Sequence, residues 1–225
     1  MKKYVLLIII LFSAFIYAFA QDSQKYDCFR VLNTKAEIKE FLFKRYAFEK
    51  KDFESGDIIA DVGAGNGYVS GMISCFYNNL NFYIQDIDTS CCNLREVKKV
   101  FDHYMEIKGK NDTKYEIVIG KPDDTGLPNN KFNKIIMCSV FHFLPDPYTF
   151  FKGLNSKLTK EGKLYLINFF AEDESSRNKL MDGENVYYEP TLNEMIEPIE
   201  KAGFKLIKVK MNKHSSYNKI IFGID

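Results

Sequence analysis

Small and acidic residues follow a predicted strand at a point where a ligand can approach the backbone. The segment from Asp61 to Gly67 reads Asp-Val-Gly-Ala-Gly-Asn-Gly and follows the apolar run 57–62. Glycines at a strand-to-helix junction permit a tight turn and close contact between backbone and ligand. The spacing is G-x-G-x-G, whereas a dinucleotide loop has G-x-G-x-x-G, so a nicotinamide-dependent oxidoreductase is disfavoured.

A second acidic position lies at the end of the next predicted strand. Asp86 closes the run 81–86 and comes 23 residues after Gly63. An acid at this place in an α/β sheet commonly accepts hydrogen bonds from ribose hydroxyls. The pattern therefore predicts a ligand that carries a ribose, with adenosine as the favoured choice.

Alternating strands and helices must position these residues. Apolar stripes at helical spacing, such as 69–76 and 94–101, predict helices between the strands. The pairs Thr34/Glu37 and Thr191/Glu194 have the form of capping boxes and predict the starts of two more helices. Short apolar runs predict strands at 57–62, 81–86, 114–120, 163–169, 204–209 and 219–224, and the segment 132–143 holds another, centred on 135–137.

The order of these elements predicts the fold class. Repeated strand–helix units favour an α/β architecture: a Rossmann-like, doubly wound, mostly parallel seven-stranded sheet with helices on both faces. Ligands of such sheets bind beyond the carboxyl ends of the strands. The chemistry is therefore expected just after the first four strands.

Five segments together resemble the class I S-adenosylmethionine-dependent methyltransferases. In the order of that family they read DVGAGNG, QDID, GKPDDTGLP, FNKIIMCSVFHFLPDP and LTKEGKLYLINF, and they cover about residues 57–170. The resemblance implies S-adenosylmethionine as cofactor and methyl transfer as the activity. Asn133 and Glu161-Gly162 depart from the family's usual aspartate and proline-glycine pair, but neither position has to bind the cofactor.

The resemblance also implies roles for individual residues. Asp61 would face the methionyl ammonium, and an acid suits a cofactor that carries an ammonium and a sulfonium. Asp86 and the adjacent Ile87 would hold the ribose, and either Asp123 or Asp124 would accept from the adenine amino group. The residues expected at the methionyl part and near the reactive methyl are Gly63, Ala64, Gly65, Gly67, Cys138 and Ser139.

The acceptor side is less defined in the sequence. His142, just after the fourth strand, is the candidate general base; the alternative is a histidine packed under the loop. The acceptor pocket is expected between the N-terminal helix, the segment after the fourth strand and the charged insertion 170–190. Tyr187 and Tyr188 of that insertion can fold over an acceptor as a lid, or the insertion is a solvated surface.

Charge and composition bear on the partners. The 225 residues hold 31 basic and 30 acidic side chains, a net charge of +1. This balance argues against a strongly basic nucleic-acid binder. We therefore expect a small-molecule acceptor, no nucleic acid and no metal. Five cysteines leave at least one thiol unpaired, and buried small side chains are their expected role.

The N-terminal segment has the pattern of a targeting signal. Lys2 and Lys3 precede an uncharged run at 4–20, and Ala18-Phe19-Ala20 has the small-x-small pattern of a signal peptidase site. The sequence thus predicts that residues 1–20 are a signal peptide. The alternative is a retained membrane anchor, because the run is at the short limit for a span.

Two expectations follow if residues 1–20 are a signal peptide. Residues 21–225 form a single methyltransferase domain that is exported, periplasmic or secreted, and contacts a membrane only through residues 1–20 if these are uncleaved. Because S-adenosylmethionine is made in the cytosol, an exported non-catalytic protein that binds S-adenosylmethionine or S-adenosylhomocysteine on the same fold is the alternative function.

Overall fold

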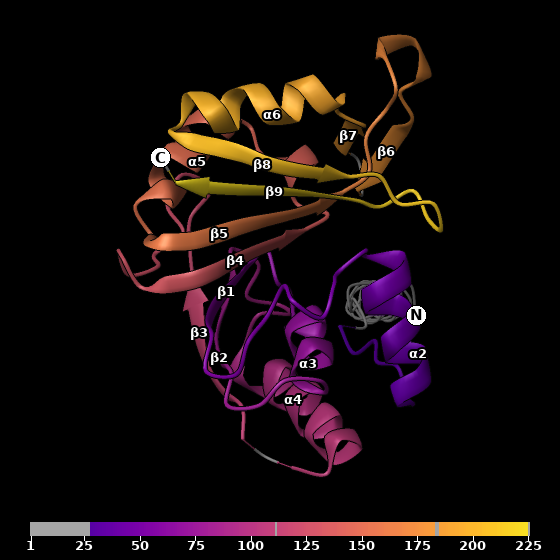
Figure 1. The fold of residues 1–225 in the computed structure, drawn as a ribbon, viewed down its shortest axis with the longest axis vertical. Helices are drawn as coiled ribbons and strands as arrows, with labels where there is room; N and C mark the ends of the chain where they lie inside the picture. Colours follow the sequence, from indigo (N-terminus) through magenta and orange to yellow (C-terminus); the bar gives the residue numbers. More distant parts are fainter. Residues whose placement is uncertain (1–27, 111, 183–184, 225) are drawn as a thin grey trace, which may run out of the picture.

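The computed structural model describes residues 28–110, 112–182 and 185–224, so the predicted signal segment lies outside the described residues. A seven-stranded sheet with the order β3-β2-β1-β4-β5-β9-β8 forms the centre of the molecule (Figure 1). Of its strands, β9 runs antiparallel to both neighbours. This confirms the predicted mostly parallel, doubly wound sheet. The strands are β1 (Ile58–Val62), β2 (Asn81–Asp86), β3 (Lys114–Ile119), β4 (Phe132–Cys138), β5 (Leu158–Asn168), β8 (Phe204–Lys210) and β9 (Asn218–Ile224).

Helices cover both faces of this sheet. Both predicted capping boxes are present, at Thr34 and Thr191. Within the described ranges, no helix combines the length and apolar character needed to cross a bilayer. The helices on one face are α2 (Lys35–Lys39), the π-helix η1 (Glu40–Arg45), α3 (Tyr68–Ser74) and α4 (Leu94–Lys108), and those on the other are α5 (Pro147–Asn155) and α6 (Leu192–Lys201).

The alternation of strand side chains divides the core into two layers. Ile59 and Ile84 point into the layer beneath η1, α3 and α4, whereas their neighbours Ala60 and Tyr83 point into the layer beneath α5 and α6. Strands that are buried on both faces read as continuous apolar runs, which is why the central strands were visible in the sequence.

The first helix changes its winding in the middle. Its α-helical turn passes into a π-helix whose last bond runs from the amide of Tyr46 to the carbonyl of Phe41 at 2.9 Å. π-helical turns often occur at functional sites. This one places Arg45 and Tyr46 at the carboxyl edge of the sheet, near the end of β4.

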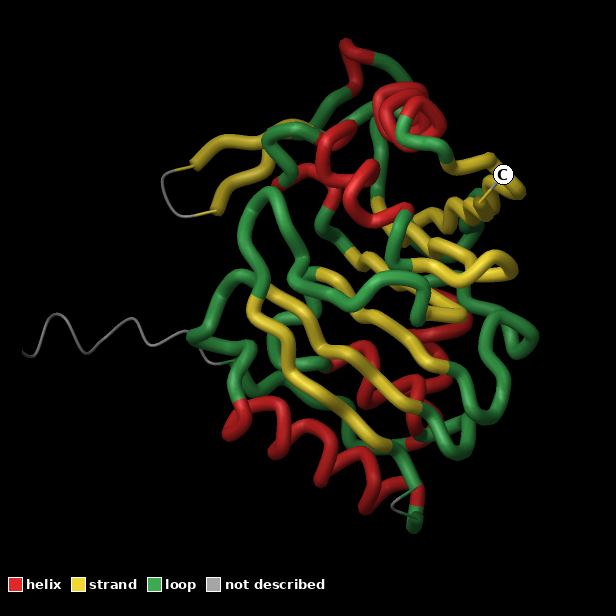
Figure 2. The backbone as a smooth tube through the Cα atoms, turned by 90° about the vertical axis from the view of Figure 1, so that its left-hand side faces the viewer, coloured by secondary structure: helices red, strands yellow, loops and turns green. Residues whose placement is uncertain are grey.

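Two segments differ from the expectation. The fifth strand begins at Leu158, five residues before the predicted start, and contains Gly162. A Cβ at Gly162 would lie 2.8 Å from the carbonyl oxygen of Phe132, so glycine here serves close strand packing and does not end a helix. The charged insertion contains a hairpin, β6 (Lys179–Asp182) and β7 (Asn185–Tyr188), which stands off the body in Figure 2.

The segment before α2 is tied to the sheet edge. A disulfide joins Cys28 to Cys91 in the loop after β2, and the side-chain amide of Asn66 donates to the Cys28 carbonyl. The sequence had not indicated this pairing. Disulfides persist mainly in oxidising compartments. The remaining cysteines, which are free thiols, are Cys75, Cys92 and Cys138.

Candidate active site

The loop between β1 and α3 lies against the neighbouring strands. Gly63, Gly65 and Gly67 all have positive φ, at 70°, 54° and 77°. The amide of Gly63 donates to the carbonyl of Gln85 in β2 at 2.9 Å. A Cβ on Gly63 would come within 2.3 Å of the Val140 side chain. Glycine is therefore required at Gly63 both by its conformation and by a close approach.

The Asp86 carboxylate connects this loop to the end of β2. Its Oδ2 accepts from the amide of Gly65 at 2.7 Å, and its Oδ1 accepts from the amides of Ile87 and Asp88 at 2.7 and 2.9 Å. A carboxylate offers about four lone-pair sites, so one remains for a further donor. The carboxylate is thus fixed in position and can still accept from a hydroxyl.

A cavity of about 420 Å³ opens beyond the carboxyl ends of β1, β2 and β4. Ile87 lies at its rim and is 55% exposed. Tyr187, from the β6–β7 hairpin, reaches the same cavity. Its lining residues from the predicted set are Gly63, Asp86, Ile87 and Ser139. The structure therefore brings the loop and the predicted ribose-binding acid together in one cavity.

Asp61 lies beneath the loop and is only 2% exposed. Its Oδ2 accepts from the hydroxyl of Ser70 at 2.6 Å. Burial, and to a smaller extent the nearby Asp86, raise the pKa of Asp61 to about 7. A cation placed next to a buried carboxyl group stabilises its charged form. Its contact with the methionyl ammonium stays a prediction.

The predicted adenine-binding acids lie elsewhere. Asp123 and Asp124 line a separate cavity of about 180 Å³. The amide of Lys121 donates to the Asp124 carbonyl at 2.6 Å, which closes a tight turn. This turn presents Lys121 and Pro122, and not the acids, to the 420 Å³ cavity. The structure does not bring Asp123 and Asp124 to the other predicted residues.

The end of β4 presents Cys138 and Ser139, as predicted. Ser139 has φ of 61°, which is rare for a residue with a side chain. Its Oγ is buried and makes no hydrogen bond of ordinary geometry in the described part of the chain, with the Tyr46 hydroxyl nearby. A buried hydroxyl without a partner is costly unless a ligand satisfies it. Burial raises the pKa of the Cys138 thiol well above its ordinary value, so this thiol is neutral.

His142 lies in the short 3₁₀ turn η2 (Phe141–Phe143) after β4. Its ring packs 4.1 Å from that of Phe143 and 5.1 Å from that of Phe169, measured between centroids. Burial lowers the pKa of His142, so the neutral imidazole predominates at neutral pH. Its Nδ1 is buried and makes no hydrogen bond of ordinary geometry among the described residues, although the Asn168 side chain lies close enough to oppose the lowering of its pKa. A neutral imidazole with an unused nitrogen can accept a proton.

Two tyrosines near the end of β4 had not been predicted. Tyr46 follows η1, and its ring lies 5.0 Å from that of Tyr217, which precedes β9. Cys138 and Ser139 are among the neighbours that perturb Tyr46, whose pKa is raised chiefly by burial. These residues come from segments far apart in the chain, so no local pattern could have joined them.

Comparison with known proteins identifies the core of the chain. Residues 60–166 match the family model described as a methyltransferase domain. A tRNA U34 carboxymethyltransferase of Aliarcobacter butzleri is 27% identical over 182 residues, covering 78% of this chain and 54% of the relative. One from Campylobacter jejuni is 32% identical over 117 residues, covering 49% and 39%. The chain spans about half the length of the curated relatives it matches.

Solved structures agree on the fold. The crystal structure of an S-adenosylmethionine-dependent methyltransferase from Aquifex aeolicus matches with a TM-score of 0.56 and 20% identity, covering 85% of this chain and 98% of that one. The expected fold class is confirmed. The domain match supports the expected S-adenosylmethionine-dependent methyltransferase and its cofactor.

The expected partners need correction. A small-molecule acceptor without nucleic acid is contradicted by the curated relatives, because their names specify a tRNA. The net charge of +1 misled because it sums over the whole chain. Contacts to phosphate require only a local group of cations, which a neutral total can hide.

Proposed function

We propose that this S-adenosylmethionine-dependent methyltransferase modifies a nucleobase of RNA, with tRNA as the acceptor class that its curated relatives name. The observation that carries the proposal is a row of aromatic rings at the acceptor edge, formed by Tyr46, Tyr217, Phe169 and His142. Unpaired bases in RNA are commonly recognised by stacking on aromatic side chains. A planar base placed along this row would lie near the end of β4.

The cofactor would bind in the 420 Å³ cavity. Asp86 would accept from the ribose hydroxyls, and Ile87 would cover the ring system from the rim. The glycine loop would approach the methionyl part, and Asp61 would offset its positive charge. Ser139 Oγ, which makes no hydrogen bond of ordinary geometry among the described residues, supports a polar ligand at this place.

Catalysis would rest on positioning and on one proton acceptor. When bound, S-adenosylmethionine supplies an electrophilic methyl group. Holding the acceptor atom in line with that group supplies most of the rate enhancement. His142 would take the proton from the attacking nitrogen or oxygen at Nδ1. The neutral Cys138 thiol does not favour a covalent enzyme intermediate.

Labelled methyl transfer tests this function. The full chain is incubated with methyl-labelled S-adenosylmethionine and total tRNA, and the digested nucleosides are analysed by mass spectrometry. We expect label in one nucleoside, with a mass increase of one methyl group rather than a carboxymethyl group. An Asp86→Ala variant should lose the product together with cofactor affinity. Folded protein that binds the cofactor and leaves every RNA nucleoside unlabelled would refute the proposal.

The compartment decides which RNA pool is relevant. Export of the body stays a prediction, and the Cys28–Cys91 disulfide supports it because the cytosol keeps most thiols reduced. Trapping thiols in intact cells measures the state of this pair. If the pair is oxidised, RNA outside the cytosol is the pool to screen for the acceptor. If the pair is reduced, export is refuted and the cytosolic tRNA pool should be screened instead.

A further inference from the structure

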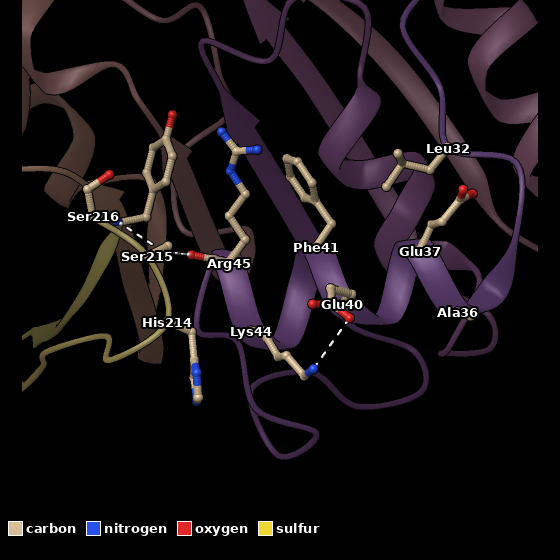
Figure 3. A pocket seen from close by; sticks show the side chains of 11 residues that line it. Leu32, Ala36, Glu37, Glu40, Phe41, Lys44, Arg45, His214, Ser215 and Ser216 are labelled. Atoms are coloured by element: carbon tan, nitrogen blue, oxygen red, sulfur yellow. Dashed lines mark hydrogen bonds and ion pairs between the residues drawn. The ribbon is translucent and has the colours of Figure 1, made fainter.

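A second cavity lies beside the aromatic row. It has a volume of about 850 Å³ and separates α2 and η1 from the turn that leads into β9 (Figure 3). Leu32, Ala36 and Phe41 give it an apolar floor, while His214 and Tyr217 belong to the facing turn. It shares no lining residue with the 420 Å³ cavity, so the two cavities can hold different groups.

Arg45 lies in this cavity next to two aromatic rings. In Figure 3 its side chain rises from η1 beside Phe41. The guanidinium carbon lies 5.1 Å from the centroid of the Phe41 ring and 5.5 Å from that of Tyr217. Contact with two rings orients a guanidinium and leaves its in-plane N–H groups available to an anion.

No acidic side chain of the described chain neutralises Arg45. Among the acids of the cavity, Glu40 pairs with Lys44 at 3.3 Å. Glu37 accepts from the amides of Asn33 and Thr34 in the capping box, at 3.1 and 3.0 Å. Glu40 is thus paired with a cation, and Glu37 is held in the capping box but keeps its negative charge. The Arg45 guanidinium has no carboxylate partner among the described residues.

The two walls of the cavity are held together before any ligand binds. The Asn212 side-chain amide donates to the carbonyls of Lys44 and Arg45 at 2.7 and 2.8 Å. The Ser215 hydroxyl donates to the same Arg45 carbonyl at 2.6 Å. The backbone beneath the guanidinium is thus fixed, which lowers the entropic cost of binding.

The cavity adjoins the acceptor edge through one shared ring. Tyr217 contacts Arg45 on one side, and on the other its ring lies 5.8 Å from that of Phe169, which packs against His142. We propose that Arg45 binds a phosphate group of the acceptor nucleotide in this cavity, while the base reaches the aromatic row. The inference rests on the proposed RNA acceptor and adds an anion site that anchors it. Arg–phosphate contacts are frequently bidentate, and the exposed N–H edge fits such a pair.

Binding of small nucleotides tests this site without catalysis. Calorimetry compares uridine 5′-monophosphate with uridine on the full chain. The phosphate should tighten binding by about tenfold or more, as expected for a charged hydrogen-bond pair. An Arg45→Ala variant should bind both compounds equally. Arg45→Lys keeps the charge but loses the planar fork, and it should recover only part of the difference.

Lys44→Ala is the matched control, because it removes one positive charge from the same cavity. It should keep the preference for the phosphorylated compound. The affinity for S-adenosylmethionine should be unchanged in Arg45→Ala; a parallel loss would assign Arg45 to the cofactor carboxylate and overturn the proposal. Equal binding of the two compounds by the wild-type chain would also overturn it.

Failure of this inference is distinguishable from failure of the proposed function. A phosphate preference that depends on Arg45, in a protein that labels no RNA, would retain the anion site and refute the RNA reaction. Labelled RNA with a KM that Arg45→Ala does not raise would retain the reaction and refute the anion site. If the RNA reaction and the anion site are both correct, Arg45→Ala raises the KM for RNA and leaves kcat nearly unchanged.

Discussion

The glycine-loop side of the 420 Å³ cavity is built from backbone, whereas the 850 Å³ cavity is lined by side chains from segments far apart in the chain. The first depends on amides of the glycine loop, held by Asp86 and by the β2 carbonyl of Gln85. The second depends on a guanidinium placed between two rings. Apart from Tyr187, the lining residues of the first lie within the matched domain, residues 60–166, and none of those of the second do.

This difference explains how one fold can serve many acceptors. A loop that binds through its backbone needs fixed glycines and a fixed acid, so it tolerates little change. A cavity built from η1 and the turn 212–217 can change its side chains without altering the sheet. Function on a common fold is determined by such sites, and the acceptor must be argued from them and not from the fold.

The largest expected effect concerns the disulfide between the segment before α2 and the loop after β2. Replacing Cys28 and Cys91 together with serine should lower the free energy of unfolding by about 4 kcal/mol, given the 63-residue separation. Chemical denaturation measures it. Reductant should shift the wild-type midpoint to that of the variant and leave the variant unchanged. A wild-type midpoint that does not respond to reductant would contradict the disulfide's role.

Removing the candidate base should affect the reaction and not the cofactor. His142→Gln should lower kcat on the RNA acceptor by about a thousandfold, within the range for general bases. Because burial lowers the pKa of His142, wild-type activity should fall as pH falls, with a midpoint below the ordinary 6.5. Calorimetry should give an unchanged Kd for S-adenosylmethionine. A histidine that only packs under the loop would leave the pH profile intact.

The backbone-built side was largely predictable from the sequence. The predicted strand 81–86 coincides with β2, and Asp86 at its end lines the 420 Å³ cavity, while its contact with a ribose stays a prediction. Periodicity and glycine spacing are local signals, and they are strong where strands are buried on both faces. The fifth strand begins at Leu158, before its predicted start at 163, and Gly162 within it permits close packing against Phe132.

The side-chain-built side could not be predicted in the same way. Arg45, Tyr46 and Tyr217 become neighbours only through tertiary packing. The pair Lys219 and Asp52, buried and 2.5 Å apart, is equally invisible because 167 residues separate its members. Such contacts follow from the topology of the fold, and no local pattern in a single sequence indicates them.

Alanine variants of Gly63 and Gly65 distinguish the effect of a steric clash on cofactor binding from the effect of backbone strain. Gly63→Ala should weaken S-adenosylmethionine binding by about 50-fold, because the new Cβ meets Val140 and the left-handed φ is strained. Gly65→Ala adds only the strain, since nothing lies within 4 Å of its Cβ. Its loss should be about fivefold. Equal losses in titrations of two folded variants would mean that steric contact does not shape this cavity.

The smallest expected effect tests whether binding of S-adenosylmethionine also depends on the buried charge of Asp61. The pKa of Asp61 is raised to about 7, so the free protein holds a proton that a cationic ligand displaces. Affinity for S-adenosylmethionine should therefore increase about tenfold between about pH 5.5 and pH 7. Because the native state binds this extra proton, ligand-free stability should decrease as pH rises over the same window. Asp61→Asn should abolish both trends while keeping the bond with Ser70. Affinity that is flat with pH in the wild type would show that the glycine loop binds the cofactor without this charge.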